Sequence, residues 1–419
     1  MTTDAGMACA HETKSRLIQS EGRHNGSNSE STSLLTNALL WFGAGVSLAE
    51  ILTGTYLAGM ELSSAVLAIV LGHIIGGVLL FFSGLIGARE KLAAMDTVKG
   101  SFGSIGGRLF AVLNVVQLVG WTGIMLYDGA LATEGIYPLG GATYAVILGL
   151  LLLFWLHRGL AHASRVNVFA VAGLFLLTLV LSYVLASGGS SMGVIEASSA
   201  EVMTFGAALE LSIVMPLSWL PLISDYTSKA ASPIRATAVS AVSYTVVSIW
   251  MYGIGMTAAK YFGESDISAI LLKAGLGTAA LFIVLFSTVT TAFLDAYSAG
   301  VSARSISSRI DETKAAVSVV ILGTLGAMFL PMDDITEFLY FIGSVFAPMI
   351  AILLTDYFLL GHKETVGAFH IKNLRLWLVG FILYRYVMSI ELSYGYTIPT
   401  MLAVAALKYG WEKISPARA

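Results

Sequence analysis

After Ser33 the chain is a succession of apolar stretches of roughly 17 to 27 residues, each long enough to cross a hydrocarbon layer of about 30 Å as a helix. Lipid offers no partners to free backbone groups, so these stretches must be helical. Apolar residues make up 56% of the 419 residues and charged residues only 12%, about half the usual share, which excludes a soluble globular protein. The twelve predicted spans are 34–58, 63–87, 106–128, 140–157, 166–187, 203–224, 234–260, 276–301, 314–331, 336–360, 374–393 and 395–410.

The basic residues predict the orientation. If the N-terminus is cytoplasmic, only Lys260 and Lys273 fall in exterior loops and Arg385 within a span; all other lysines and arginines are cytoplasmic. The predicted exterior segments 188–202 and 332–337 carry acids and no base. The positive-inside rule therefore places both termini in the cytoplasm of a multi-pass protein, expected in the plasma membrane.

Several other classes of function are excluded. A net charge of -3 leaves no basic excess for nucleic acid, and Cys9, as the single cysteine, forms no intrachain disulfide or cysteine-ligated zinc site. Motifs of the HExxH or GxxxxGK[ST] type are absent from the sequence, and so is a nucleophile motif. We therefore expect no enzyme and no cofactor. His73, within GHIIGG, is expected to be a packed polar residue, with Gly72 and Gly76 permitting close helix packing.

The domain organisation follows from the spans. Residues 1–33 are polar, lack the apolar core of a secretory signal and predict a disordered cytoplasmic tail. Two blocks of five spans, 34–187 and 203–360, precede two additional helices within 374–410.

Two spans carry helix-breaking residues at membrane depth. The first contains Gly43 and Gly45, and the sixth contains Pro216 and Pro221, which remove two backbone donors. Irregular backbone survives within a membrane only where it lines a site, and breaks in the first span of each five-span block match the inverted-repeat transporter plan. Unwound carbonyls such as that of Val46 can then coordinate a cation.

Polar side chains in the spans are candidates for the site. The eighth span offers Ser287 and Thr288, hard oxygen ligands suited to sodium, although such hydroxyls often bond to their own helix instead. Glu50 and Glu210 flank the two breaks and are expected to border the central cavity. The alternative is that both are structural carboxyls. Asp295 could pair with Arg385. Asp225 and Asp356 are expected to cap helices at the cytoplasmic surface.

Gln117 and Trp121 lie four residues apart on one face of the third span. Glutamine both donates and accepts hydrogen bonds, and tryptophan offers a flat stacking surface, so the pair suits a planar heterocycle. A packing tryptophan with a helix-to-helix glutamine bond is an equally good interpretation of these two residues.

The motifs resemble those of the nucleobase:cation symporter-1 family, and in particular its branch of hydroxymethylpyrimidine permeases, often named CytX. The resemblance runs from about Leu39 to Gly361 and is carried by NALLWFGAGVSLAEILTG, NVVQLVGWTG, ALELSIVMPLSWLPLISDYTS, STVTTAFLDAYSAGVS and FLYFIGSVFAPMIAILLTDYFLL. It implies an all-α membrane protein of twelve transmembrane helices with a five-plus-five inverted-repeat, LeuT-like fold, helices 1 and 6 broken, and alternating access driven by a cation gradient.

The resemblance also implies site residues. The sodium ligands it implies are Gly43, Val46, Val284, Ser287 and Thr288. The substrate residues expected here are Glu50, Gln117, Trp121, Glu210 and Trp219, and the resemblance implies Trp121 as the stacking surface. Glu50 and Glu210 are added on chemical grounds and not from the family, because a carboxylate accepts from the exocyclic amine of an aminopyrimidine. Two positions depart from the family pattern: Gln117 lies four residues before Trp121 where cytosine permeases have three, and Phe293 stands where some relatives use an asparagine.

The expected function is import of a small planar heterocycle, chiefly the hydroxymethylpyrimidine precursor of thiamine. The alternative is a cytosine, purine or other nucleobase permease of the same family. Glu50 or Glu210 could carry a proton, so Na⁺ and H⁺ both stay open as the coupling ion. The expected partners are the substrate and the bilayer, with no nucleic acid and no obligate protein partner.

Overall fold

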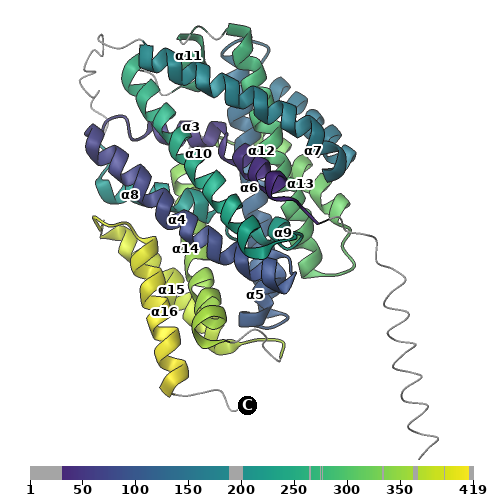
Figure 1. The fold of residues 1–419 in the computed structure, drawn as a ribbon, viewed down its shortest axis with the longest axis vertical. Helices are drawn as coiled ribbons and strands as arrows, with labels where there is room; N and C mark the ends of the chain where they lie inside the picture. The colour runs from purple at the N-terminus through teal and green to yellow at the C-terminus, as the bar shows by residue number, and fades with distance from the viewer. Residues whose placement is uncertain are drawn as a thin grey trace, which may run out of the picture.

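The computed structural model describes residues 31–187, 202–263, 266–273, 275, 277–332, 335–361, 367–390 and 392–414. The predicted tail lies outside these residues except for 31–33. The described chain folds into one helical bundle, in which α15 and α16 lie together at one side (Figure 1). Its helices are α2 (Leu34–Gly45), α3 (Leu48–Thr55), α4 (Leu62–Glu90), α5 (Ala94–Phe102), α6 (Gly106–Glu134), α7 (Gly141–Ser187), α8 (Phe205–Leu217), α9 (Ile223–Thr227), α10 (Pro233–Phe262), α11 (Ile267–Lys273), α12 (Gly277–Ile306), α13 (Glu312–Phe329), α14 (Ile335–Leu354), the π-helix η1 (Thr355–Leu360), α15 (Ile371–Ser389) and α16 (Thr397–Ile414).

The helices follow the predicted spans in order. Among the described residues, six helical segments are each long and apolar enough to cross a membrane, and α2 with α3 forms a seventh span bent by 45°. The remaining predicted spans correspond to α7, to α8 with α9, and to α15 and α16. One difference is that α7 is a single helix of 47 residues, Gly141–Ser187, which joins the predicted spans 140–157 and 166–187 without a loop. The short helices α5 and α11 were not predicted.

Both predicted breaks are confirmed. Helix α2 ends at Gly45, and Val46 has φ -84° and ψ 80°, outside the helical region. Ser47 then caps α3, its Oγ accepting from the Glu50 backbone N–H at 3.2 Å. The sixth span ends its first half at Leu217 and resumes at Ile223, so that Pro221 lies within the interruption.

Close packing of α4 on α8 depends on small residues. A Cβ added at Gly72 would overlap Ser212, and one added at Gly76 would overlap the Pro216 ring. These glycines therefore let α4 approach the broken sixth span, as predicted.

Asp225 and Asp356 are both buried, which corrects the prediction that they cap helices at the surface. Asp225 does act as a cap, but for α5: its Oδ1 accepts from the Ala94 backbone N–H at 2.9 Å. Asp356 instead pairs with Lys408, their Oδ1 and Nζ 3.0 Å apart.

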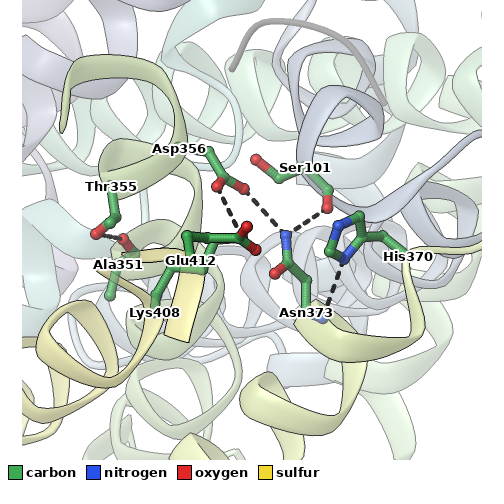
Figure 2. Close-up of polar contacts among 8 residues, drawn as sticks. All are labelled: Ser101, Ala351, Thr355, Asp356, His370, Asn373, Lys408 and Glu412. Atoms are coloured by element: carbon green, nitrogen blue, oxygen red, sulfur yellow. Dashed lines mark hydrogen bonds and ion pairs between the residues drawn. The ribbon is translucent and has the colours of Figure 1, made fainter. Parts of the chain in front are cut away.

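The pair belongs to a polar cluster at one end of α14, α15 and α16 (Figure 2). Lys408 also contacts Glu412 Oε1 at 2.9 Å. The Asn373 amide donates to Asp356 Oδ2 at 3.0 Å and to the Ser101 carbonyl at 2.7 Å, which ties the last helices to α5. Burial, with the charge of Lys408, lowers the pKa of His370, and the neutral ring can accept from the Asn373 backbone N–H.

Candidate functional site

A small pocket lies between the two helix breaks. It is lined from α2–α3, α6, α8–α9 and α12 by Ser47, Glu50, Trp121, Met125, Met215, Ser218, Trp219, Leu222 and Asp295. The breaks expose polar backbone here, at the place where an inverted-repeat transporter holds its substrate. Three of the five predicted substrate residues, Glu50, Trp121 and Trp219, thus meet in one pocket.

The two tryptophans that line the pocket are packed against other aromatic side chains. Trp121 is buried and packs edge-on against Phe338, with ring centroids 5.4 Å apart. Its Nε1 has no hydrogen-bond partner among the described residues. Trp219 contacts Trp41 and Tyr244 edge-on, at 5.5 and 6.0 Å. Fixed rings of this kind offer a flat ligand a stacking surface at little cost in side-chain entropy.

Two carboxyl groups also line the pocket. Glu50 is hydrogen-bonded to the Tyr244 and Ser248 hydroxyls, both at 2.6 Å. Asp295 Oδ2 is buried and has no hydrogen-bond partner among the described residues. Arg385 is exposed on α15, so the structure does not bring together the suggested Asp295–Arg385 pair. Oδ2 of Asp295 is thus available to a donor on a ligand.

Gln117 is not one of the lining residues, but it is hydrogen-bonded to Ser218, which is. Its Nε2 donates to the Ser218 carbonyl at 2.8 Å and to Asn114 Oδ1 at 3.2 Å, whereas its Oε1 is buried without a partner. Asn114 in turn donates to the Pro221 carbonyl at 3.2 Å. The two amides therefore bind carbonyls that the broken helix leaves free, which fits the alternative of a helix-to-helix bond for Gln117.

Glu210 lies apart from the pocket lining. Its Oε1 accepts from the Tyr384 and Thr397 hydroxyls, both at 2.6 Å, and its Oε2 accepts from the backbone N–H groups of Tyr396 and Thr397 at 2.6 and 2.9 Å. These donors belong to α15 and to the start of α16. The structure gives Glu210 the contacts of an anchor for α16, the structural alternative left open by the sequence, and leaves it out of the lining of this pocket.

We predict that Glu210→Gln destabilises the protein instead of changing its substrate preference. The amide has only one acceptor oxygen, so its NH₂ group would face hydrogen-bond donors of α15 or α16 and those bonds would be lost. The expected cost is about 1–3 kcal/mol in the free energy of unfolding. Thermal unfolding in detergent measures the change, with Glu337→Gln, at an exposed position of α14, as control. A variant of unchanged stability that discriminates between amino and non-amino ligands would contradict this assignment.

The predicted cation ligands are partly brought together. Ser287 Oγ donates to the Val46 carbonyl at 2.9 Å, linking α12 to the first break, and Val46 and Val284 belong to one buried cluster. Thr288 Oγ1 is buried and has no hydrogen-bond partner among the described residues. Gly43 is buried in the last turn of α2. The Thr288 hydroxyl lies next to Gly129 of α6, so of these two hydroxyls only that of Ser287 contacts the break. A buried hydroxyl without a partner can still serve a hard cation as a ligand.

Several site residues were not identified from the sequence. Ser47 and Ser218 line the pocket because each lies beside a break, a signal that was available. Asp295 was noticed but not assigned to the substrate. The contacts of Ser248 with His73 and with Glu50 depend on helix packing alone and left no local sequence signal.

Comparisons with known proteins agree with this geometry. The family model for permeases for cytosine/purines, uracil, thiamine and allantoin matches residues 27–373. The cytosine permease of Escherichia coli (strain K12) is 23% identical over 364 residues, covering 85% of this chain and 84% of that protein. The purine-cytosine permease FCY2 of Saccharomyces cerevisiae is 26% identical over 209 residues, covering 46% of this chain and 38% of that protein.

Solved structures show the fold. Mhp1, a nucleobase-cation-symport-1 family transporter in a closed conformation with bromovinylhydantoin bound, superposes with a TM-score of 0.77 at 20% identity, covering 94% of this chain and 97% of that one. A Na⁺-coupled sialic acid symporter matches with a TM-score of 0.69 at 14% identity, covering 95% and 94%. These likenesses confirm the predicted LeuT-like transporter fold. The chain is a multi-pass membrane protein that belongs to the nucleobase:cation symporter-1 family of permeases.

Proposed function

We propose that this protein imports a small planar aminoheterocycle, 4-amino-5-hydroxymethyl-2-methylpyrimidine above others, together with a cation. The observation that carries the proposal is the pocket between the two breaks, in which Trp121 and Trp219 meet the carboxyl groups of Glu50 and Asp295. Tryptophan suits a flat ring, and carboxyl oxygens accept from an exocyclic amine and a hydroxymethyl group.

The same chemistry separates classes of substrate. The exocyclic amine and hydroxyl of hydroxymethylpyrimidine are donors, whereas both exocyclic groups of uracil are carbonyl acceptors and only its ring N–H groups donate. Acceptors facing carboxylates are disfavoured in a pocket screened from water. A cytosine or purine permease is the second candidate, because cytosine also carries an exocyclic amine and the E. coli cytosine permease matches most of this chain.

Competition for binding tests the substrate. Purified protein is titrated with hydroxymethylpyrimidine, cytosine, uracil, hypoxanthine, thiamine and a hydantoin, with and without sodium. We expect hydroxymethylpyrimidine to bind tightest and uracil weakly. If cytosine or a purine binds tightest, the second candidate replaces the first; if uracil does, the donor-recognition argument fails.

We also propose that Gly43, Val46, Val284, Ser287 and Thr288 hold a sodium ion. We predict that Ser287→Ala combined with Thr288→Ala raises the sodium concentration needed for half-maximal binding steeply, because two oxygen ligands are lost. Substrate affinity at fixed sodium must fall with it, because coupling is reciprocal.

Thr290→Ala is the matched control for this prediction, because the Thr290 hydroxyl bonds to the Phe286 carbonyl of its own helix at 2.6 Å. Sodium titrations of ligand binding measure the shift. A wild-type protein whose binding ignores sodium would remove this cation site from the proposal.

We propose cytoplasmic termini on the evidence of the basic residues. In a Cys9→Ser background, we predict that a cysteine at Leu139, which is 66% exposed, reacts with impermeant reagent added outside intact cells. One at Ser308 is expected to react only after the membrane is opened. Labelling in the reverse sense would overturn the orientation.

A further inference from the structure

Three buried side chains form a chain of short hydrogen bonds that ends at the pocket. His73 Nε2 lies 2.6 Å from Ser248 Oγ, and Ser248 Oγ lies 2.6 Å from Glu50 Oε2. His73 Nδ1 lies 2.8 Å from the Ile69 carbonyl oxygen. All three residues are at most 1% exposed. They join α4 and α10 to the half-helix α3 that follows the first break.

The donors and acceptors of these three side chains match only if an additional proton is bound to them. A carbonyl oxygen only accepts, so His73 Nδ1 must carry hydrogen. If His73 is neutral, Nε2 accepts the single Ser248 hydrogen, and Glu50 must be a carboxylic acid that donates to Ser248. If Glu50 is ionised, Ser248 donates to it, and His73 must be an imidazolium that donates to Ser248.

Both arrangements hold one proton more than a neutral histidine with an ionised glutamate. Without that proton, two acceptors would face each other across 2.6 Å in a site closed to water, which is strongly unfavourable. The packing seen here therefore requires a bound proton, which resides either on Glu50 or on His73.

The hydrogen-bonded series reaches the pocket at Glu50, and few other titratable groups lie near it. Glu50 lines the pocket, where Asp295 of α12 is the other titratable group and Trp121 of α6 does not titrate. From α10, Tyr244 donates to Glu50 Oε1, and Tyr252 packs edge-on against His73 with ring centroids 4.6 Å apart. No lysine or arginine occurs among the pocket-lining residues, so a single proton strongly changes the net charge facing a ligand.

We propose that Glu50, Ser248 and His73 form an exchangeable proton site that fills when substrate is enclosed in the pocket. The inference rests on the proposed transport function and adds a proton to its coupled ions. The proton comes from water, binds to the Glu50–Ser248–His73 chain without any covalent change, and returns to water when the pocket opens. Because this packing needs the proton, a substrate that binds preferentially to it and the proton must strengthen each other's binding.

The experiment measures ligand affinity against pH, using whichever heterocycle binds tightest in the competition assay. For the wild type we expect the ligand's dissociation constant to increase as the pH is raised, by up to about tenfold per pH unit, across part of the range from about pH 5 to about pH 8. Calorimetry in two buffers of different ionisation enthalpy should show proton uptake approaching one per ligand bound. The ligand's own titration is measured separately and subtracted.

Variants locate the proton. His73→Gln should flatten the pH dependence and reduce the proton uptake, because a neutral amide can donate to or accept from Ser248 without an additional proton. Ser248→Ala, which cuts the chain, should do the same. Ser240→Ala is the matched control: this buried hydroxyl of the same helix bonds to the Ala236 carbonyl at 2.8 Å, and its pH curve should follow the wild type.

Two results would overturn the proton site: a wild-type proton uptake of zero, or a pH curve that is the same in the wild type and in a folded His73→Gln or Ser248→Ala protein. If neither variant folds, the wild-type proton count alone decides. None of these results bears on whether the protein binds and imports a heterocycle, because that proposal is tested separately by the competition assay and by gradient-driven uptake.

Discussion

Replacing Trp121 by alanine is expected to weaken substrate binding by about 1–3 kcal/mol, which corresponds to about five- to more than hundredfold in affinity. Trp121 lines the pocket between the breaks and is held by the edge-on ring of Phe338. Removing the indole takes away the stacking surface and admits water beside the ligand. Calorimetric titration with hydroxymethylpyrimidine measures the loss.

Trp121→Phe should retain part of the affinity, because a smaller ring still stacks. Trp411→Ala is the control, since that indole lies on α16 at 43% exposure, away from the pocket lining. A folded Trp121→Ala protein that binds as tightly as the wild type would show that the substrate does not lie against this residue.

Lys408→Met is expected to lower the free energy of unfolding by about 3–5 kcal/mol, because it leaves two buried carboxylates without their shared cation. The ammonium group contacts Asp356 at 3.0 Å and Glu412 at 2.9 Å, and the lysine side chain is 3% exposed (Figure 2). Denaturant or thermal unfolding in detergent measures the loss.

Lys413→Met on the same helix is the matched control, since Lys413 is exposed. It should change stability little, as surface charges usually do. Adding Asp356→Asn to Lys408→Met should recover part of the loss, because one of the stranded charges is then removed. Equal stability of the Lys408 and Lys413 variants would show that the buried ion pair does not hold the last helices in place.

The membrane fold could be predicted from the sequence because its determinants are local. A span is recognised from its own length and hydropathy, and a break from glycines or prolines such as Gly43 and Pro221 within it. Both breaks occur where they were predicted. The continuity of α7 was not foreseen, because the polar residues between its two apolar parts resemble a loop and still form helix.

The roles of single polar residues depend on packing between distant segments. Glu50 and Glu210 each follow or precede a break, yet one lines the pocket and the other accepts four hydrogen bonds from α15 and α16. From the sequence alone Asp356 resembles a surface residue, because its partner Lys408 lies far along the chain and only the fold brings the two together. His73 was expected only to pack, and its neighbour Ser248 is 175 residues away.

Gradient-driven uptake by the purified protein in sealed proteoliposomes tests the central claim most directly. Radiolabelled hydroxymethylpyrimidine is supplied outside, with an inward gradient of sodium, of protons, of both or of neither. We predict saturable accumulation above the external concentration with an inward cation gradient, none after the gradient is dissipated, and strong loss of uptake in Trp121→Ala. Uptake that only equilibrates, at a rate indifferent to both gradients, would contradict a cation-coupled transporter.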